Sequence, residues 1–262
     1  MNRAMHAAAT GMNAQQLYID TIANNLANVN TTGYKRSKVE FQDLLYETIR
    51  PAGAVTTSGV ETPVQLQVGC GTRPVATPRI FTQGDLTSTG NALDLALQGD
   101  GFFQIRRPDG VTVYTRDGSF KVSADGKLVT AAGYVVQPEI SLPLETQSVH
   151  IGRDGTVTVT VAGSSEPYEV GQLELARFIN PAGLKSIGDN LYEMTVASGE
   201  PILGTPQSEG FGEVLQGYLE ASNVEVVEEM VSMIVAQRAY EINSKAIRTA
   251  DDMLGIVTNL KR

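Results

Sequence analysis

The sequence is poor in the residues that build chemical sites. Its 262 residues include no tryptophan, one cysteine and two histidines. The single cysteine, Cys70, can form no disulfide within the chain, and no metal-ligand spacing surrounds it. His6 and His150 lie far apart in the sequence, and neither a G-x-S-x-G nor a P-loop pattern occurs. We therefore expect no enzymatic activity, no cofactor, no metal ion and no small-molecule substrate.

Long apolar runs and clusters of basic residues are also missing. The first residues contain no apolar segment of the kind found in secretion signals, and no run of eighteen apolar residues occurs anywhere. The 20 Lys and Arg residues are scattered and are outnumbered by 29 Asp and Glu, for a net charge of -9. These features predict no membrane span, no cleaved signal peptide and no nucleic-acid partner. Composition alone would indicate a cytoplasmic protein of two or three domains.

The chain has instead a heptad pattern at each end. In residues 222–262 five apolar side chains recur every seven residues, which predicts one long helix with a coiled-coil seam. This seam consists of Val226, Met233, Tyr240, Ile247 and Leu254, with Met230 and Gln237 beside it. Residues 222–225 form an S-x-x-E pattern, which predicts a capping box at the helix start. A single amphipathic helix of this length cannot bury its apolar stripe alone, so it needs a partner.

The first thirty residues supply that partner. Here the side chains follow a 3-4 spacing over four heptads, and only one member of the series is polar. The series is Met5, Ala8, Met12, Gln15, Ile19, Ile22, Leu26 and Val29. The favoured interpretation is a terminal coiled-coil domain made of residues 1–34 and 222–262. The alternative is a pair of amphipathic helices that pack on a globular core.

Three asparagines precede the end of the first helix. The helix should stop within residues 30–33, because Asn and Gly tolerate left-handed backbone conformations. Asn24, Asn25 and Asn28 stand before this stop, although asparagine is a mediocre helix former. Two interpretations remain open, a fraying last turn and a ladder of side-chain amides that bond to neighbouring chains.

Residues 35–80 are expected to connect the first helix to a different kind of structure. A short amphipathic piece at residues 39–50 offers Phe41, Leu44, Leu45 and Ile49 for packing. Residues 46–63 end in text rich in Gly, Thr and Pro, which predicts an extended arm rather than core.

Residues 81–221 carry the signature of short antiparallel strands. Asp-Gly pairs begin at positions 100, 109, 117 and 125, with alternating apolar runs between them. These pairs also raise the possibility of bound calcium, but the G-G-x-G-x-D nonapeptide of calcium-binding repeats is missing. The expected fold class is α+β, with a discontinuous terminal α-helical coiled coil and an inserted, mainly antiparallel β-domain.

Charge is distributed unevenly between the two ends. Lys35, Arg36 and Lys38 follow the first helix, whereas Glu225, Glu228 and Glu229 open the last one. One hypothesis is that these basic residues meet the acidic helix start of an adjacent subunit, which would favour register and encounter rate. The other interpretation is that the charges are only solvated surface.

Terminal heptad helices around an inserted β-domain, joined by N-N-L-A-N-V-N-T-T-G-Y-K-R, resemble the axial proteins of the bacterial flagellum, the rod and hook family. The resemblance covers essentially the whole chain. It is greatest to the distal-rod branch, on strings such as F-Q-D-L-L-Y (residues 41–46), G-T-R-P-V-A-T (71–77), G-D-G-F-F (99–103), Y-T-R-D-G-S-F (114–120), I-G-R-D-G (151–155) and Q-R-A-Y-E-I-N-S-K (237–245).

The resemblance implies a structural subunit that self-assembles into a rigid helical tube, a drive shaft that transmits motor torque to the hook and filament. The implied partners are further copies of the chain, proximal rod proteins, the hook or hook–rod junction, the surrounding rings and the flagellar export apparatus. The implied location is the periplasmic basal body, reached by type III export without cleavage. The implied distal-rod arm falls on residues 46–63, where Val55-Thr56-Thr57-Ser58 departs from the usual Gln- and Ser-rich text.

The expected assembly interface combines the heptad residues with the asparagines and the basic pair. It comprises Met5, Met12, Ile19, Ile22, Asn24, Asn25, Leu26, Asn28, Val29, Lys35, Arg36, Val226, Met230, Met233, Gln237, Tyr240, Ile247 and Leu254. The alternatives are a hook or proximal-rod paralogue and a secreted adhesin with a coiled-coil stalk. Heptads divided between the two ends of a chain favour assembly over a stalk.

Overall fold

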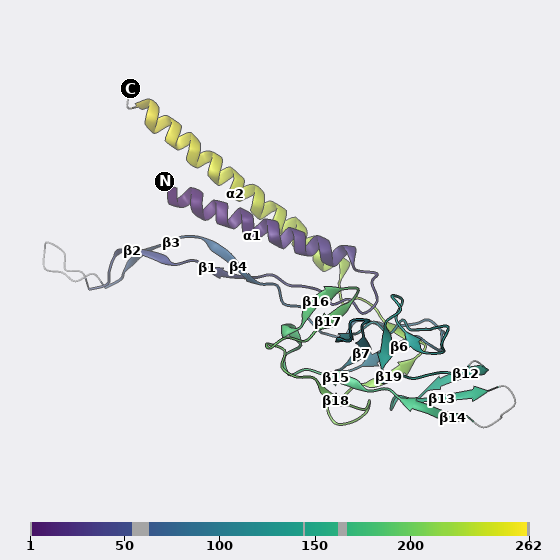
Figure 1. The fold of residues 1–262 in the computed structure, drawn as a ribbon. Coiled ribbons are helices and arrows are strands. Elements are labelled where there is room, and N and C mark those ends of the chain that lie inside the picture. Colours follow the sequence, from purple (N-terminus) through teal and green to yellow (C-terminus); the bar gives the residue numbers. More distant parts are fainter. Residues whose placement is uncertain (1, 54–62, 144, 162–166, 261–262) are drawn as a thin grey trace. The chain divides into compact units, whose positions relative to one another are not determined.

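The computed structural model describes residues 2–53, 63–143, 145–161 and 167–260, and its contacts divide the chain into two units (Figure 1). The helical unit comprises residues 1–26, 37–78 and 225–262, and the β unit comprises residues 27–36 and 79–224. The sequence prediction drew these boundaries differently. It assigned residues 27–34 to the helical domain and residues 37–78 to a connecting segment, and here the first group belongs with the β unit and the second with the helices.

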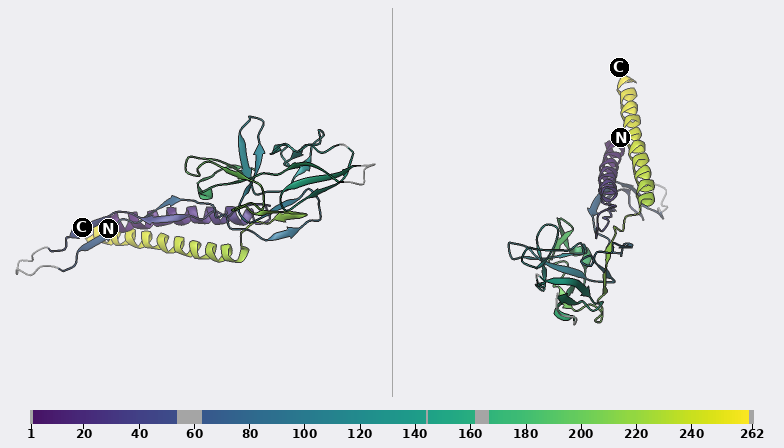
Figure 2. Two further views of the ribbon diagram at one scale, coloured as in Figure 1. Left: turned by 90° about the horizontal axis from the view of Figure 1, so that it is seen from below. Right: turned by 90° about the vertical axis from the view of Figure 1, so that its right-hand side faces the viewer.

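Two antiparallel helices dominate the helical unit. Helix α1 spans Asn2–Ala27 and helix α2 spans Val226–Leu260, and the N- and C-terminal ends of the chain lie at the same end of the pair (Figures 1 and 2). Beyond α1 the chain turns at Gly33, whose φ of +66° favours glycine. The helix was predicted to stop within residues 30–33, but α1 ends at Ala27, a few residues earlier.

The predicted capping box at the start of α2 is wrong. The first helical hydrogen bond runs from Glu229 N to Glu225 O at 3.0 Å, so the helix begins after Glu225. The Ser222 hydroxyl is buried and bonds to nothing in the described part of the chain. Asn223 beside it is used elsewhere, because its side-chain oxygen accepts from Arg36 N at 2.8 Å. The acidic first turn, Glu228 and Glu229, still matches the helix dipole.

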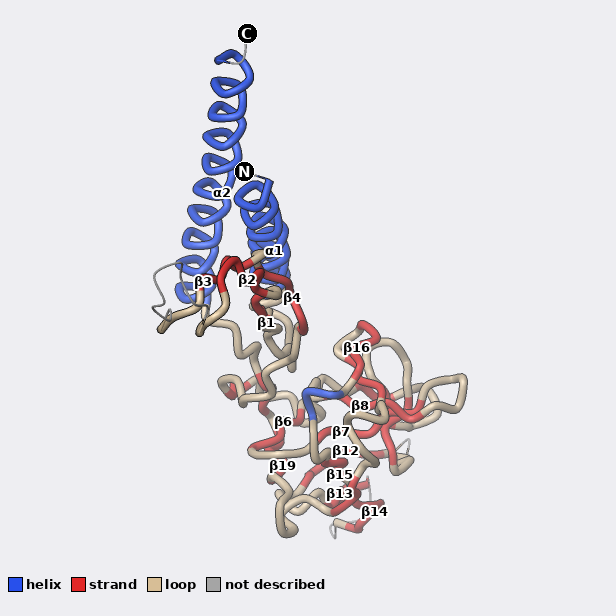
Figure 3. The backbone as a smooth tube through the Cα atoms, turned by 90° about the vertical axis from the view of Figure 1, so that its left-hand side faces the viewer, coloured by secondary structure: helices blue, strands red, loops and turns tan. Residues whose placement is uncertain are grey.

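Two short antiparallel ribbons complete the helical unit (Figure 3). Strand β1 (Glu40–Asp43) pairs with β4 (Thr72–Ala76), and β2 (Tyr46–Arg50) pairs with β3 (Leu66–Gly69). Of the residues expected to pack, Phe41 contacts the ring of Tyr18 at 6.1 Å between centroids. Leu45 and Ile49 remain 89% and 55% exposed. The expectation of a packed amphipathic piece is wrong for these two, since their part of the chain is a two-stranded ribbon. Residues 54–62 of the predicted arm lie outside the described residues.

The β unit is built around a nine-stranded antiparallel sheet. Its path runs β16 (Lys185–Gly188), β17 (Leu191–Glu193), β8 (Thr112–Thr115), β7 (Phe102–Arg106), β11 (Val135–Gln137), β10 (Leu128–Val129) and β9 (Lys121–Val122). From this path β15 (Leu175–Arg177) branches off β7 and pairs in turn with β18 (Ile202–Gly204).

Smaller sheets surround it. They are β12 (Thr146–Ile151) with β13 (Thr156–Val161) and β14 (Tyr168–Gln172), β6 (Leu95–Gln98) with β19 (Glu213–Gln216), and β5 (Leu86–Ser88) with β20 (Tyr218–Glu220). A 3-10 turn occupies Pro181–Gly183. The expected antiparallel β region between two terminal helices is confirmed.

Side chains from several of these sheets share one core. The residues 3% exposed or less include Leu95, Leu97, Phe103, Ile105, Val113, Phe120, Leu128, Val157, Leu175 and Val214. Predicted Asp-Gly turns bring the strands together, as at Gly110 and Gly126, which have φ of +84° and +78°. At Gly118 the reason for glycine is space, because a Cβ there would lie 1.6 Å from the carbonyl oxygen of Leu95.

We expect Gly118→Ala to destabilise the β unit by about 1–3 kcal/mol or more, because the backbone of β6 must move to admit the methyl group. Thermal unfolding followed by circular dichroism measures this. The control is Gly255→Ala in α2, where a Cβ meets nothing within 4 Å and the helix propensity improves. Equal melting temperatures for the two variants would contradict the packing described at Gly118.

Candidate assembly interface

Small and polar residues contact each other between helices α1 and α2. A Cβ on Gly11 would lie 2.9 Å from the Asn243 side-chain nitrogen, so these positions face each other. Two heptads further along α1, Asn25 Nδ2 donates to Glu229 Oε1 at 3.3 Å. Asn25 is 2% and Glu229 is 7% exposed, so this polar contact is buried.

The residues of α2 that face α1 lie beside the seam that the apolar pattern predicts, and we call them the α1-facing line. Glu229, Ala236 and Ala250 are buried, and Asn243 completes their spacing of seven. Within the predicted seam Val226 and Tyr240 are each 40% exposed, and Met233, Ile247 and Leu254 are half-buried. Of the two flanking residues, Met230 is 51% exposed and Gln237 is exposed. The two lines alternate at spacings of three and four, and the prediction named one of them and missed the other. Glutamate, alanine and asparagine carry too weak an apolar signal to be counted.

On α1 the predicted heptad residues differ in burial. Ile22 is 1% exposed, whereas Met5, Met12, Ile19, Leu26 and Val29 are half-buried. A second set of contacts covers α1, because Thr10 Oγ1 accepts from Thr72 N at 3.3 Å and Tyr18 packs on Phe41. Helix α1 therefore lies between α2 and the ribbon of β1 and β4.

The three asparagines do not behave alike. Asn25 is held within its own chain, since its amide donates to Ser37 O at 2.9 Å and accepts from Ser37 N at 3.0 Å. The interpretation of a ladder to neighbouring chains is thus not supported for Asn25, whose amide bonds to Ser37 and Glu229 of its own chain. Asn24 is exposed, and half-buried Asn28 accepts from the Thr31 hydroxyl at 3.1 Å.

Helix α2 carries a second apolar surface on its other side. Eight apolar side chains, between 47% and 76% exposed, project from the half of the helix opposite Glu229, Ala236 and Ala250 at about 100° per residue. This outer face of α2 consists of Val227, Met230, Val231, Ile234, Val235, Ile242, Met253 and Ile256. A helix that is apolar on two sides needs two packing partners, of which α1 is one.

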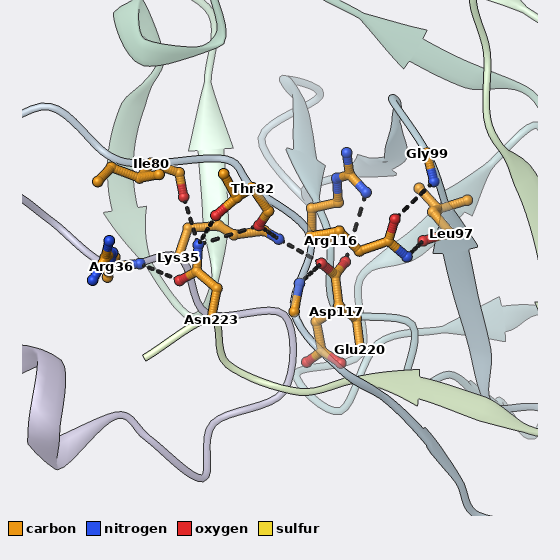
Figure 4. Close-up of polar contacts among 12 residues, drawn as sticks. Lys35, Arg36, Ile80, Thr82, Leu97, Gly99, Arg116, Asp117, Glu220 and Asn223 are labelled. Carbon is orange, nitrogen blue, oxygen red and sulfur yellow. Dashed lines mark hydrogen bonds and ion pairs between the residues drawn. The ribbon is translucent and has the colours of Figure 1, made fainter. Parts of the chain in front are cut away.

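Lys35 lies at the centre of a buried charge cluster in the β unit (Figure 4). Its ammonium group, 0% exposed, donates to Glu220 Oε1 and to the carbonyl oxygen of Thr82 at 2.7 Å. The other carboxylate oxygen of Glu220 lies 3.6 Å from Arg116 Nη1, and the Arg116 guanidinium stacks over the ring of Phe102. Burial lowers the pKa of the Lys35 ammonium, although the neighbouring Glu220 carboxylate opposes this shift.

The cluster corrects the expected role of Lys35. Its charge is used inside its own chain, so it is not available to the acidic helix start of an adjacent subunit. The backbone N–H of Arg36 donates to Asn223 Oδ1, and the side chain of Asn223 in turn donates to Ile80 O at 2.8 Å. Nothing in the sequence pattern distinguishes buried Lys35 from exposed Lys38, because both follow the same polar turn.

The described residues contain no group of three or more His, Cys, Asp or Glu side chains placed to hold a metal ion. Across the same described ranges, no helix is long and apolar enough to cross a membrane.

Comparisons with known protein families show which class this architecture represents. The family model of the flagella basal body rod protein matches residues 5–35, that of the flagellar hook protein FlgE/F/G D1 domain matches residues 96–159, and that of the flagellar basal body rod FlgEFG protein C-terminal region matches residues 215–260. The three matches, all to models of flagellar rod and hook proteins, cover most of α1 and α2 and part of the β unit.

Curated relatives narrow the class. The chain is 55% identical over 264 residues to the flagellar basal-body rod protein FlgG of Borreliella burgdorferi, with 100% of both chains covered. It is 49% identical to the protein of the same name from Agrobacterium fabrum, covering 99% and 100%, and 30% identical to the flagellar hook-basal body complex protein FlhP of Bacillus subtilis, covering 100% of each. The chain belongs to the FlgG family of flagellar basal-body rod proteins, which confirms the resemblance seen in the sequence.

A crystal structure of the Helicobacter pylori flagellar hook protein FlgE2 also matches, at 15% identity and a TM-score of 0.25, over 71% of this chain and 56% of that one. A likeness at these values defines neither the fold nor the function of this chain.

We expect Lys35→Met to destabilise the β unit by about 3–5 kcal/mol, because it leaves the Glu220 carboxylate buried with one poorly aligned cation. Chemical denaturation measures the loss. The control is Lys38→Met, which removes an exposed charge three residues away and should change stability by less than about 0.5 kcal/mol. The double variant Lys35→Met/Glu220→Leu should recover part of the loss, since no buried carboxylate is then left unpaired. A Lys35→Met protein as stable as the Lys38→Met protein would refute the buried pair.

Proposed function

We propose that the chain is a structural subunit of the distal flagellar rod, which polymerises into a rigid helical tube and transmits motor torque to the hook and filament. The observation that carries the proposal is the outer face of α2. Eight exposed apolar side chains on one helix exceed what scattered surface residues of a monomer present, and such patches mark interaction surfaces.

The occupant of that face is a helix of a second copy. Membership of a rod family makes repeated copies of one chain the neighbours that α2 meets, and an apolar helix face is complementary to another apolar helix face. Where such contacts are head-to-tail and do not close into a ring, they generate a helical polymer. In this arrangement the heptad residues of both helices form a coiled-coil layer.

The further partners follow from a position within the rod. At its two ends the polymer meets proximal rod proteins and the hook or hook–rod junction, and around it lie the rings of the basal body. The subunit reaches this periplasmic location through the flagellar export apparatus without a cleaved signal peptide. Composition alone would have indicated the cytoplasm, and family membership supports the basal body instead.

Two alternatives from the sequence are less well supported. The chain is 55% identical to a FlgG protein and 30% identical to FlhP, and this difference disfavours a hook or proximal-rod paralogue. A secreted adhesin is disfavoured by membership of a rod family.

The assembly proposal is tested by Val231→Asp on the outer face. Val231 is 56% exposed, so the monomer should keep its helicity, whereas a charge placed in a surface dried by assembly should abolish polymerisation. Sedimentation velocity measures polymerisation, and swimming of a strain that carries the variant measures function. The matched control is Val111→Asp in the β unit, which is 42% exposed and lies outside the helices. A Val231→Asp protein that polymerises like this control would exclude the outer face from the interface.

The hairpin of β2 and β3 is proposed to stiffen the polymer by contacting adjacent subunits. Tyr46, Ile49 and Leu66 in this hairpin, and Leu45 next to it, are at least half exposed. Replacing residues 46–69 by a short Gly-Ser linker should leave a polymer that bends more, as seen in the bending persistence of negatively stained rods. Unchanged stiffness would reduce the hairpin to a connection.

A further inference from the structure

The contacts between α1 and α2 define a single register. Gly11 and Asn25 are fourteen residues apart on α1, and Glu229 and Asn243 are fourteen residues apart on α2. One antiparallel alignment therefore accounts for both contacts, and paired positions in it have residue numbers that add up to 254. Fourteen residues are two heptads, so the two contacts occupy equivalent places along the seam.

The apolar residues alone cannot hold this register. Met5, Met12, Ile19 and Leu26 on one helix and Met233, Tyr240, Ile247 and Leu254 on the other all repeat every seven residues. Sliding one helix past the other by seven residues places apolar side chains opposite apolar side chains again. Such a slip changes little in apolar burial and is a known ambiguity of heptad seams.

Polar residues at the seam remove the ambiguity. After a slip in one direction Glu229 would face Tyr18 and Asn243 would face Ala4, and in the other direction Asn25 would face Ala236 and Asn243 would face Tyr18. Each slip removes the amide that bonds to the buried Glu229 carboxylate, and each moves Asn243 away from the space that Gly11 leaves open. A buried carboxylate that loses a hydrogen-bond donor is destabilised, so both slips are disfavoured.

From this geometry we infer that the Asn25–Glu229 hydrogen bond and the Gly11–Asn243 contact select the register of the α1–α2 pair. The four residues that make these contacts are positioning residues. Their role is specificity rather than stability, because apolar side chains at these positions would pack as well or better. Asn25 is suited to this role because Ser37 N and O hold its amide in a fixed orientation toward α2. The register in turn fixes which part of the outer face of α2 extends beyond the end of α1.

Crosslinking of cysteine pairs in the full-length chain tests the inference. In a Cys70→Ala background, Gln15→Cys is combined with Ala239→Cys, which is in register, or with Ser232→Cys or Ala246→Cys, each one heptad away. A short thiol-specific crosslinker should join the in-register pair at least about tenfold faster than either slipped pair, the factor expected if a slip breaks one hydrogen bond to a charged group. Equal rates in this parent would overturn the inference.

The decisive comparison replaces the polar contact. Asn25→Leu/Glu229→Leu should reduce the preference to about twofold or less while helicity, measured by circular dichroism, is kept or rises, because the slipped registers lose their penalty. Val231→Leu on the outer face is the matched control and should keep the parent preference. A double variant that is helical and still prefers the in-register pair tenfold would overturn the inference.

Two further variants guard against a misfolded double variant. Glu229→Gln keeps a side chain able to bond to the Asn25 amide and should keep the preference. Asn243→Ala removes the side chain that lies against Gly11 without adding bulk there, and should lower the preference on its own. If Asn243→Ala leaves the preference unchanged while Asn25→Leu/Glu229→Leu loses its helicity, the polar contacts serve stability and the inference fails.

Discussion

The structure depends on a constraint at the place where the chain enters and leaves its β unit. Lys35 follows the turn after α1, and Glu220 ends the last strand before α2, so the two residues stand near the two ends of the inserted region. Their ion pair is buried with Arg116, and it holds together segments of chain separated by 185 residues in sequence. An isolated charge in such a place would be prohibitive, so the β unit is complete only when both of its ends are in place.

The helical unit also contains buried polar contacts, and there they define how two helices align. Two of its helix–helix contacts again involve polar side chains, Asn25 bonded to Glu229 and Asn243 lying against Gly11. Apolar side chains line the seam beside them and cover the opposite side of α2 as well. Apolar area supplies the attraction between helices, and the few polar contacts decide which of several similar alignments is adopted. A subunit that has to repeat identically along a polymer gains from one defined alignment.

An exposed apolar helix face is normally a liability, because it promotes aggregation. In a rod subunit the same face is a means of assembly, and it is positioned by residues that lie on the other side of the same helix. This division explains why α2 has no purely polar side in its first turns, where Val227, Val231 and Ile234 are exposed. It also explains why seven-residue spacing reveals two long helices but does not reveal which of their sides pack together within one chain.

The sequence by itself determined the class of fold, the two terminal helices and the antiparallel β region, since seven-residue and two-residue periods and Asp-Gly turns are local signals. It also determined the family, through strings of residues that span the chain. Only the tertiary structure decided the partner of each side chain. Lys35 and Lys38 look alike in sequence, yet one is buried against Glu220 and the other is exposed. Helix α2 starts at Val226, because Ser222 does not cap it and Asn223 beside it bonds to the chain at Arg36 and Ile80. The α1-facing line of Glu229, Ala236, Asn243 and Ala250 stayed hidden, because burial of small and polar residues depends on what the fold places against them.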